Sequence, residues 1–419
     1  MRITGPDITK LGKAMVNANP QNGFIWVNRI QEDTLQWTNY SSPDENGQVN
    51  SQGITMTTSI LVGHKFEVFP TLDGGYGYIT VGKNPNVTET QLPPELLIDP
   101  LWIVNVIFIR PTGEITQPSL IYPRVSPAID INIELCDNAY DSPGLICIVS
   151  IQVNVNVIYY VKIGFLSNGS TKEPIRMDIN TNNILVDHIY SLYNGGYVVS
   201  AKLKNIQQQS ISSGYIYYSR GGYYGEWNCP KIVGNFIIPK GVFPNNTFWM
   251  FSDGGYNEND ANSLIEENGS GWTMMTTNIP KLIIDRGYNN LNVNATSPTI
   301  NSTINIGETV LNITYYNTVS LSVGNISIYQ HDFTTDQLIL RQSYSANTPF
   351  TLLLQDKKTL ALRVLNSTFN NPGSNYTVVI DNNAVKDLSF EEPLLGIPPD
   401  LWKFSTESEP QQHDGEYYN

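Results

Sequence analysis

The residues best suited to chemistry are scattered along the chain rather than gathered into a known catalytic motif. The four histidines, His64, His188, His331 and His413, stand in unrelated contexts, and none forms a metal-spaced pair such as His-Glu-x-x-His. We expect them to be surface or strand residues. There is also no Gly-x-Ser-x-Gly elbow, Walker loop or dinucleotide fingerprint. The sequence therefore predicts no catalytic residue, no cofactor and no metal.

Two loops have some chemical interest. The segment 253–260 alternates carboxylate and amide oxygens, which hard cations such as Ca²⁺ prefer, but it lacks EF-hand spacing and a terminal bidentate Glu. We interpret it as a solvated turn. The segment 268–273 resembles part of the Asp-box turn of sialidase-like propellers, without its Asp and without a second copy. Carboxylates that hydrolyse glycosides pair in space rather than in sequence, so a carbohydrate-active enzyme remains an alternative.

The best binding candidate is an aromatic run just past the midpoint of the chain. Aromatic faces can stack on sugar rings or anchor a protein partner. The competing interpretation is that these side chains fill the interfaces between sheets. The candidate ligand-binding residues are Tyr215, Tyr217, Tyr223, Tyr224 and Trp227, with Tyr218 in the same run.

Glycine-rich turns recur and must position these residues. Asp73-Gly74-Gly75 has counterparts at 142–144, 194–196 and 244–246, spaced about 50–70 residues apart. A second series lies at 31–33, 111–113, 167–169, 220–222 and 278–280. Asn-Gly and Asp-Gly supply the positive φ of tight hairpins, and no helix follows them, which argues against a phosphate-binding loop.

Two hairpin turns in each unit of about 50–57 residues predict four-stranded antiparallel blades. Such units cannot bury their faces alone, so we predict an all-β propeller-like region of about five blades, with the first represented mainly by its outer hairpin. Val149 to Val157 alternate with polar residues, which predicts one strand with an apolar face and a wet face. A β-sandwich is the structural alternative.

A second β module follows an Asn-rich segment near residues 286–298. Seven or more short alternating strands in about 110 residues are typical of an immunoglobulin-like sandwich. The module resembles the bacterial-type Ig-like domain of S-layer proteins. The matching segments are 313–316, the Gly-Asn-Ile-Ser-Ile of 324–328, the hairpin 372–380 and the Trp-Lys-Phe-Ser-Thr of 402–406.

The whole layout is similar to uncharacterised fungal surface proteins that join a propeller-like region to such a domain. The resemblance implies a surface protein with a signal peptide and often a membrane anchor. Neither a signal peptide nor an apolar stretch of spanning length is present in this sequence. The predicted organisation is a propeller-like domain at 1–288, an Ig-like β-sandwich at 292–406 and a disordered acidic tail at 407–419.

Charge and cysteine content limit the partners and the compartment. A net charge of -14 argues against nucleic acid or an anionic membrane surface. Of the three cysteines, Cys136 and Cys147 could form a disulfide if the protein is exported, which leaves Cys229 unpaired. Eleven Asn-x-Ser/Thr sequons favour the secretory route. They lie at Asn39, Asn86, Asn168, Asn245, Asn268, Asn294, Asn301, Asn312, Asn325, Asn366 and Asn375.

These observations favour a non-catalytic recognition or adhesion protein, secreted or at the cell surface. Its partner would be a protein or a glycan, and its Ig-like module would act as a spacer. Two alternatives remain: a carbohydrate-active propeller enzyme that uses the central funnel, and an intracellular interaction scaffold.

Overall fold

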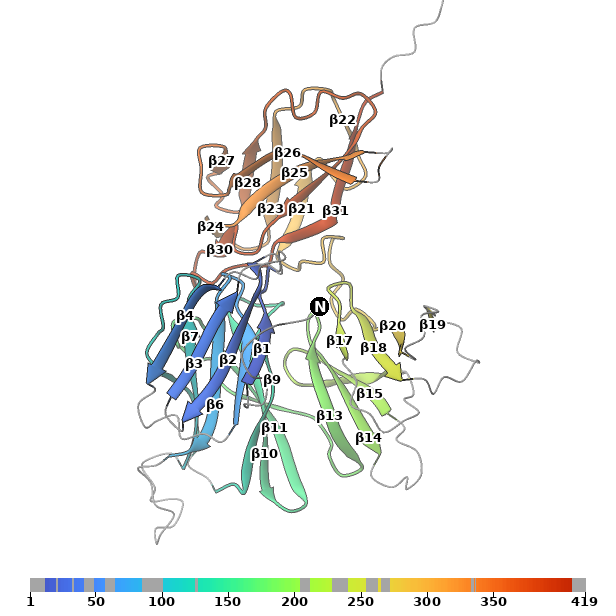
Figure 1. The fold of residues 1–419 in the computed structure, drawn as a ribbon. Helices are drawn as coiled ribbons and strands as arrows, with labels where there is room; N and C mark the ends of the chain where they lie inside the picture. The colour runs from blue at the N-terminus through green and yellow to red at the C-terminus, as the bar shows by residue number, and fades with distance from the viewer. Residues whose placement is uncertain are drawn as a thin grey trace, which may run out of the picture. The chain divides into compact units, whose positions relative to one another are not determined.

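The chain forms two compact all-β units, Met1–Ile284 (unit 1) and Asp285–Asn419 (unit 2), in a computed structural model (Figure 1). The described residues are 12–19, 22–31, 34–40, 49–56, 65–84, 101–124, 127–203, 212–227, 240–253, 263–264, 272–332, 335 and 337–408. Several predictions fall outside them: His64, Asn86, Cys229, Asn268, His413, most of the 253–260 loop and residues 409–419 of the predicted tail.

Within its described residues, unit 1 contains five four-stranded antiparallel sheets, coloured from blue to yellow in Figure 1. Sheet 1 has β1 (Gly12–Val16), β2 (Phe24–Gln31), β3 (Thr34–Tyr40) and β4 (Val49–Met56). Sheet 2 has β5 (Lys65–Pro70), β6 (Tyr76–Lys83), β7 (Trp102–Ile109) and β8 (Ser119–Arg124). Sheet 3 has β9 (Asp130–Asn138), β10 (Leu145–Asn154), β11 (Val157–Phe165) and β12 (Ile175–Met177).

Sheet 4 has β13 (Ile184–Ser191), β14 (Tyr197–Leu203), β15 (Ser212–Tyr217) and β16 (Tyr223–Trp227). Sheet 5 has β17 (Lys240–Val242), β18 (Thr247–Asp253), β19 (Ser263–Leu264) and β20 (Trp272–Asn278). Sheets 1 to 4 are simple meanders, whereas sheet 5 has the order β17-β18-β20-β19.

The first strands of consecutive sheets contact one another in series, β1 with β5, β5 with β9, β9 with β13 and β13 with β17. Separate hydrophobic clusters lie at the successive junctions, such as Val68 with Trp37 between sheets 1 and 2 and Phe165 with Phe108 between sheets 2 and 3. Sheets 2, 3 and 4 therefore each bury both faces against neighbouring sheets, which is a propeller-like repeat.

Three details of the predicted repeat were wrong. Sheet 1 has all four strands rather than mainly an outer hairpin. The predicted turns at 111–113, 167–169 and 220–222 lie between the third and fourth strands of their sheets. The segment 31–33 instead lies between the second and third strands, β2 and β3, and the segment 278–280 is at the end of β20, so neither is equivalent to those three. Val149 to Val157 is not one strand, because a turn at 155–156 separates β10 from β11. Ser150, on the predicted wet face, is buried because sheet 3 is covered on both sides.

In its described residues, unit 2 contains two main sheets and a short antiparallel pair of strands distant in sequence. The first sheet has the order β21 (Val293–Ser297), β23 (Val310–Tyr315), β28 (Thr359–Arg363) and β27 (Thr351–Leu353). The second has β22 (Thr303–Ile304), β31 (Ile397–Thr406), β29 (Asn375–Ile380), β25 (Asn325–Asp332) and β26 (Gln337–Ser345). The pair is β24 (Val319–Leu321) with β30 (Val385–Asp387).

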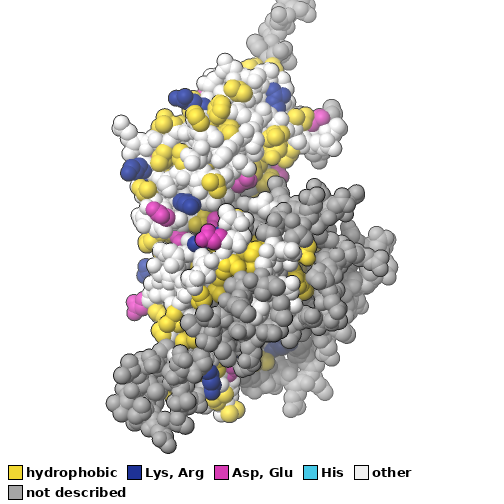
Figure 2. Space-filling view, turned by 60° about the vertical axis from the view of Figure 1, so that its left-hand side comes forward, with side chains coloured by type: hydrophobic (Ala, Val, Ile, Leu, Met, Phe, Trp, Pro, Cys, Tyr) yellow, Lys and Arg dark blue, Asp and Glu magenta, His cyan; other side chains and the backbone are white. Residues whose placement is uncertain are grey.

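Both main sheets of unit 2 contribute to one hydrophobic core that contains Trp402, Tyr376 and Ile313. The indole Nε1 of Trp402 donates to the Pro298 carbonyl at 2.9 Å, so this large buried side chain is also satisfied. The segment predicted as a linker takes part as well, since Tyr288 is buried in the core. On the face of unit 2 in Figure 2, hydrophobic side chains are scattered among polar ones.

Candidate functional site

Among the parts of unit 1 that the structure describes, six hairpin turns share one main-chain pattern. In the turn that begins at Leu192, the Gly195 N–H donates to the Leu192 carbonyl at 2.9 Å and the Leu192 N–H donates to Gly196 at 3.0 Å. The fourth residue has a φ between 63° and 88°, which glycine or Asn adopts most easily. The six turns are 71–75, 110–114, 166–170, 192–196, 218–222 and 243–247. Because first and third hairpins of a meander lie at the same end, we call this the turn end of unit 1.

The glycine before the second strand has a separate role, because it faces the last carbonyl of the third strand. A Cβ added to Gly75 would lie 2.6 Å from the Ile109 oxygen, and one added to Gly144 would lie 2.7 Å from the Phe165 oxygen. Gly196 meets the Tyr217 oxygen in the same way. The repeated glycines therefore permit close packing inside a sheet and need no ligand.

The junction between sheets 2 and 3 is closed at the turn end by Arg110. Its guanidinium donates to the Ser167 carbonyl at 3.0 Å and lies 3.5 Å from the Asp73 carboxylate. It also lies 5.4 Å from the centre of the Phe108 ring. One long side chain therefore spans two sheets and fills the space above their shared core.

The junction between sheets 3 and 4 is open at the same end. Here Leu166 occupies the turn position of Arg110 and cannot make polar contacts. Lys162, four residues earlier on β11, donates to the Ser219 carbonyl at 2.7 Å instead. A cavity of about 750 Å³ remains, lined by Asp141, Ser142, Lys162, Ile175, Arg176, Asp178, Tyr218, Ser219, Arg220, Gly222 and Ile283.

The charges of the cavity side chains balance. On β12, Arg176 is the strand partner of Val161, and the Val161 side chain is in the core shared with sheet 2. The Arg176 guanidinium lies 4.9 Å from the centre of the Tyr159 ring. Arg176 therefore points away from sheet 4 and lines the cavity through its main chain. The cations left are Lys162 and Arg220, opposed by the carboxylates of Asp141 and Asp178. Burial lowers the pKa of the Lys162 ammonium, and Asp141 partly offsets that effect.

An aromatic and acidic cluster lies beside the cavity. The Tyr140 hydroxyl donates to the Asp137 carboxylate at 3.2 Å, and the Tyr140 and Tyr193 rings stack 4.1 Å apart across the junction. Burial raises the pKa of Asp137 to about 6, although the Asn138 N–H opposes this. Burial and the Asp137 charge also raise the pKa of Tyr140. The cluster joins the turns of two sheets and precedes Asp141 in the cavity wall.

The predicted aromatic residues differ in burial and fall into three groups. Tyr217 is buried between sheets 3 and 4, and Trp227 is buried between sheets 4 and 5, where its Nε1 donates to the Asn278 carbonyl at 3.1 Å. Tyr215 is partly buried on β15. Tyr223 and Tyr224 are exposed on β16, the edge strand of sheet 4. Exposed Tyr218 packs edge-to-face on Tyr224 at 5.4 Å and joins this pair to the cavity.

Sequence reasoning missed most of the cavity. Asp141, Lys162 and Asp178 come from three separate segments of sheet 3, and Ile283 comes from a distant segment after β20. The segment after β20 reaches the site because the Ile283 N–H donates to the Asn194 carbonyl at 3.1 Å. Only the glycine turns gave a signal, since they mark where the chain returns to this end.

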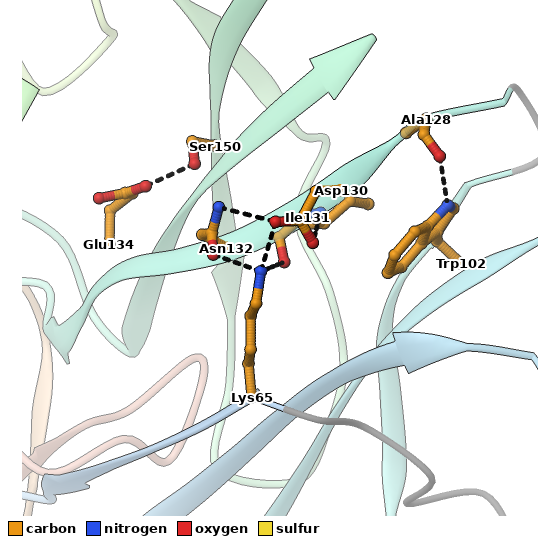
Figure 3. A network of polar contacts seen from close by, with 8 residues as sticks. All are labelled: Lys65, Trp102, Ala128, Asp130, Ile131, Asn132, Glu134 and Ser150. Carbon is orange, nitrogen blue, oxygen red and sulfur yellow. Dashed lines mark hydrogen bonds and ion pairs between the residues drawn. The ribbon is translucent and has the colours of Figure 1, made fainter. Parts of the chain in front are cut away.

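Carboxylates also occur along the first strands, where the enzyme alternative would need them. Lys13 of β1 pairs with Glu67 of β5 at 2.6 Å. Lys65 of β5 pairs with Asp130 of β9 at 2.5 Å and reaches the Ile131 carbonyl and the Asn132 side chain (Figure 3). Glu134 contacts the Ser150 hydroxyl. Two of these carboxylates are thus neutralised by lysines, which also cover the free edge of the next sheet.

The cysteine and sequon predictions fall at definite places. Cys136 and Cys147 are opposite residues of β9 and β10, with Cα atoms 4.2 Å apart and a disulfide bond between them. Asn39, Asn294 and Asn312 are partly buried, and Asn86 and Asn268 lie outside the described residues. The exposed sequon residues are Asn168, Asn245, Asn301, Asn325, Asn366 and Asn375.

The described residues contain no group of three or more His, Cys, Asp or Glu side chains placed to hold a metal ion. In the same part of the chain, no helix has the length and hydrophobicity needed to cross a bilayer.

No protein-family model matches the chain, and no curated protein matches it. Among solved structures, it is similar to a subtype N10 neuraminidase-like protein of A/little yellow-shouldered bat/Guatemala, with 12% identity, a TM-score of 0.32, and coverage of 61% of this chain and 76% of that one. The WD40 domain of SCAP from fission yeast has 9% identity and a TM-score of 0.30, with 90% and 81% covered. Likenesses this weak add nothing to the geometry above.

Proposed function

We propose that this chain is a non-catalytic recognition protein, secreted or displayed at the cell surface. Unit 1 would hold the binding site and unit 2 would act as an Ig-like spacer. The observation that carries the proposal is the turn end of sheets 3 and 4, where an open cavity adjoins the exposed Tyr218, Tyr223 and Tyr224. Exposed aromatic side chains beside a concave site are typical of surfaces that bind partners.

Three further observations support the compartment and the role of unit 2. Six sequon asparagines are exposed, so glycans could be attached without disturbing the core. Cys136 and Cys147 are buried opposite each other, which suits an oxidising compartment. The two sheets of unit 2 share a core around Trp402, as an Ig-like domain would require.

The proposal can be tested by producing the whole chain in a secretory host and measuring its binding to cell surfaces. We expect saturable binding that a double Tyr218→Ala, Tyr224→Ala variant reduces at least tenfold. Tyr316→Ala is the matched control, because Tyr316 is an exposed tyrosine of unit 2. Binding that neither variant changes would overturn the site.

The same preparation tests the compartment. Enzymatic removal of N-linked glycans should lower its mass at several of the six exposed sequons. A fully unglycosylated product from the secretory host would instead support the intracellular scaffold.

A further inference from the structure

We propose that the cavity between sheets 3 and 4 binds one neutral hexose unit of a glycan. This inference rests on the proposed recognition function and names the ligand of that site. It depends on three properties of the cavity: the balance of its charges, the mixture of donors and acceptors in its wall, and its aromatic rim.

The charge balance favours a neutral ligand. Lys162 and Arg220 are opposed by Asp141 and Asp178. An anionic ligand attracted by the two cations would be repelled by the two carboxylates, and a cationic ligand attracted by the carboxylates would be repelled by the cations. In the described part of the chain, no ion pair holds Arg220 or Asp178. Both are therefore free to hydrogen-bond a ligand.

The polar groups match sugar hydroxyls, which both donate and accept hydrogen bonds. Asp141 and Asp178 can accept from a hydroxyl, while the Arg220 guanidinium and the Lys162 ammonium can donate to one. The Lys162 ammonium is held in place by the Ser219 carbonyl and lies 5.5 Å from the Tyr197 ring. A donor fixed in this way loses little freedom when a ligand binds.

The apolar part of the wall suits the C–H face of a pyranose. Ile175 and Ile283 line the cavity, and Tyr218 stands at its rim. The Tyr218 ring is packed edge-to-face against Tyr224 with an interplanar angle of 87°, so the orientation of this rim residue is restricted before a ligand binds. The cavity volume of about 750 Å³ is within the range of small-molecule sites. It leaves room for the next unit of a glycan.

The test is titration of the whole chain with methyl glycosides of glucose, galactose, mannose and N-acetylglucosamine, followed by NMR and calorimetry. We expect at least one of them to bind with a millimolar Kd. Arg220→Ala and Asp178→Asn should each weaken that binding about tenfold. Both residues are exposed, so folding should persist. Arg363→Gln, on an exposed residue of unit 2, is the matched control and should change nothing.

Charged analogues make the test decisive. Glucuronate and glucosamine should bind more weakly than the neutral sugar, and tighter binding of either would overturn the charge argument. Failure of all four neutral glycosides would overturn the inference. If cell binding persists but hexoses neither bind nor compete, the recognition function stands and only its ligand is wrong. If the protein binds hexoses but does not bind cell surfaces, the hexose site is supported and the proposed cell-surface role is rejected.

Discussion

The junction of sheets 2 and 3 and the junction of sheets 3 and 4 are built alike and end differently. Both have an apolar core, the same turns and a cation that donates to the second carbonyl of the neighbouring turn, Ser167 or Ser219. Arg110 stands in the turn itself and fills the end of the first junction. Lys162 lies deeper on β11, and the end of the second junction is open.

The comparison shows that the same repeat can form a closed junction or an open cavity. Which of the two forms depends on whether the cation lies in the turn, as Arg110 does, or on the preceding strand, as Lys162 does. Asp73 and Asp141 illustrate the consequence. Asp73 has the Arg110 guanidinium beside it, whereas Asp141 faces a cavity. Carboxylates and cations that the fold leaves uncommitted are the ones that can serve a ligand.

The largest effect on stability should come from the glycine that both junctions share in their turns. Gly196→Ala would place a Cβ against the Tyr217 carbonyl at a φ of 79°, so we expect a loss of about 3 kcal/mol or more. Gly75→Ala, with a contact of 2.6 Å to Ile109, should cost about 2 kcal/mol. Urea unfolding measures both.

Gly225→Ala is the control for these variants, because a Cβ there would have no neighbour within 4 Å. Equal stability of Gly225→Ala and Gly196→Ala proteins would contradict the structural role of the repeated glycine.

The next effect concerns Asp137, which is half-buried at the open junction and accepts a hydrogen bond from Tyr140. Its pKa is raised from 3.8 to about 6, mainly by burial, so the folded protein binds the proton more tightly than the unfolded chain does. The stabilising contribution is complete below about pH 4 and is lost as the pH rises through 6. A shift of this size corresponds to at most about 3 kcal/mol.

Asp137→Asn should therefore raise the urea midpoint at pH 7 and leave it nearly unchanged at pH 4. The Asn side chain can still accept from the Asn138 N–H and from Tyr140, so packing should persist. A pH dependence identical to that of the wild type between 4 and 7 would contradict the assignment.

The sequence predicted local features well because they depend on local geometry. Asp73-Gly74-Gly75 and its copies identified hairpins, since only a few residues tolerate the required φ. The all-β class and the repeat of four-stranded sheets followed from them. Properties that depend on neighbouring sheets were not predictable. The alternating sequence of β10 predicts that one face is exposed to solvent, yet residues 145–151 are all buried because a sheet covers each face. The cavity was missed for the same reason.

Arg110→Met tests the closed junction and should have a moderate effect. The variant loses the hydrogen bond to Ser167 and the ion pair with Asp73, while much of the packing over Phe108 is kept. We expect a loss of about 1–2 kcal/mol, most of it from the charged hydrogen bond. Lys202→Met, on an exposed residue of β14, provides the control in urea unfolding. A loss no greater than that of the control would show that Arg110 does not close the junction.

The smallest effect on stability, and the sharpest test of the comparison, is Leu166→Arg. This substitution puts a guanidinium at the turn position of Arg110, from which it should reach the Ser219 carbonyl and Asp141. The new contacts should offset the lost burial of Leu166, so stability should change by about 1 kcal/mol or less. Hexose binding should fall at least tenfold because the cavity is filled. Leu166→Met keeps the volume without the charge and should retain binding. If Leu166→Arg folds and still binds the sugar as tightly as Leu166→Met does, then the missing arginine is not what makes this junction a site.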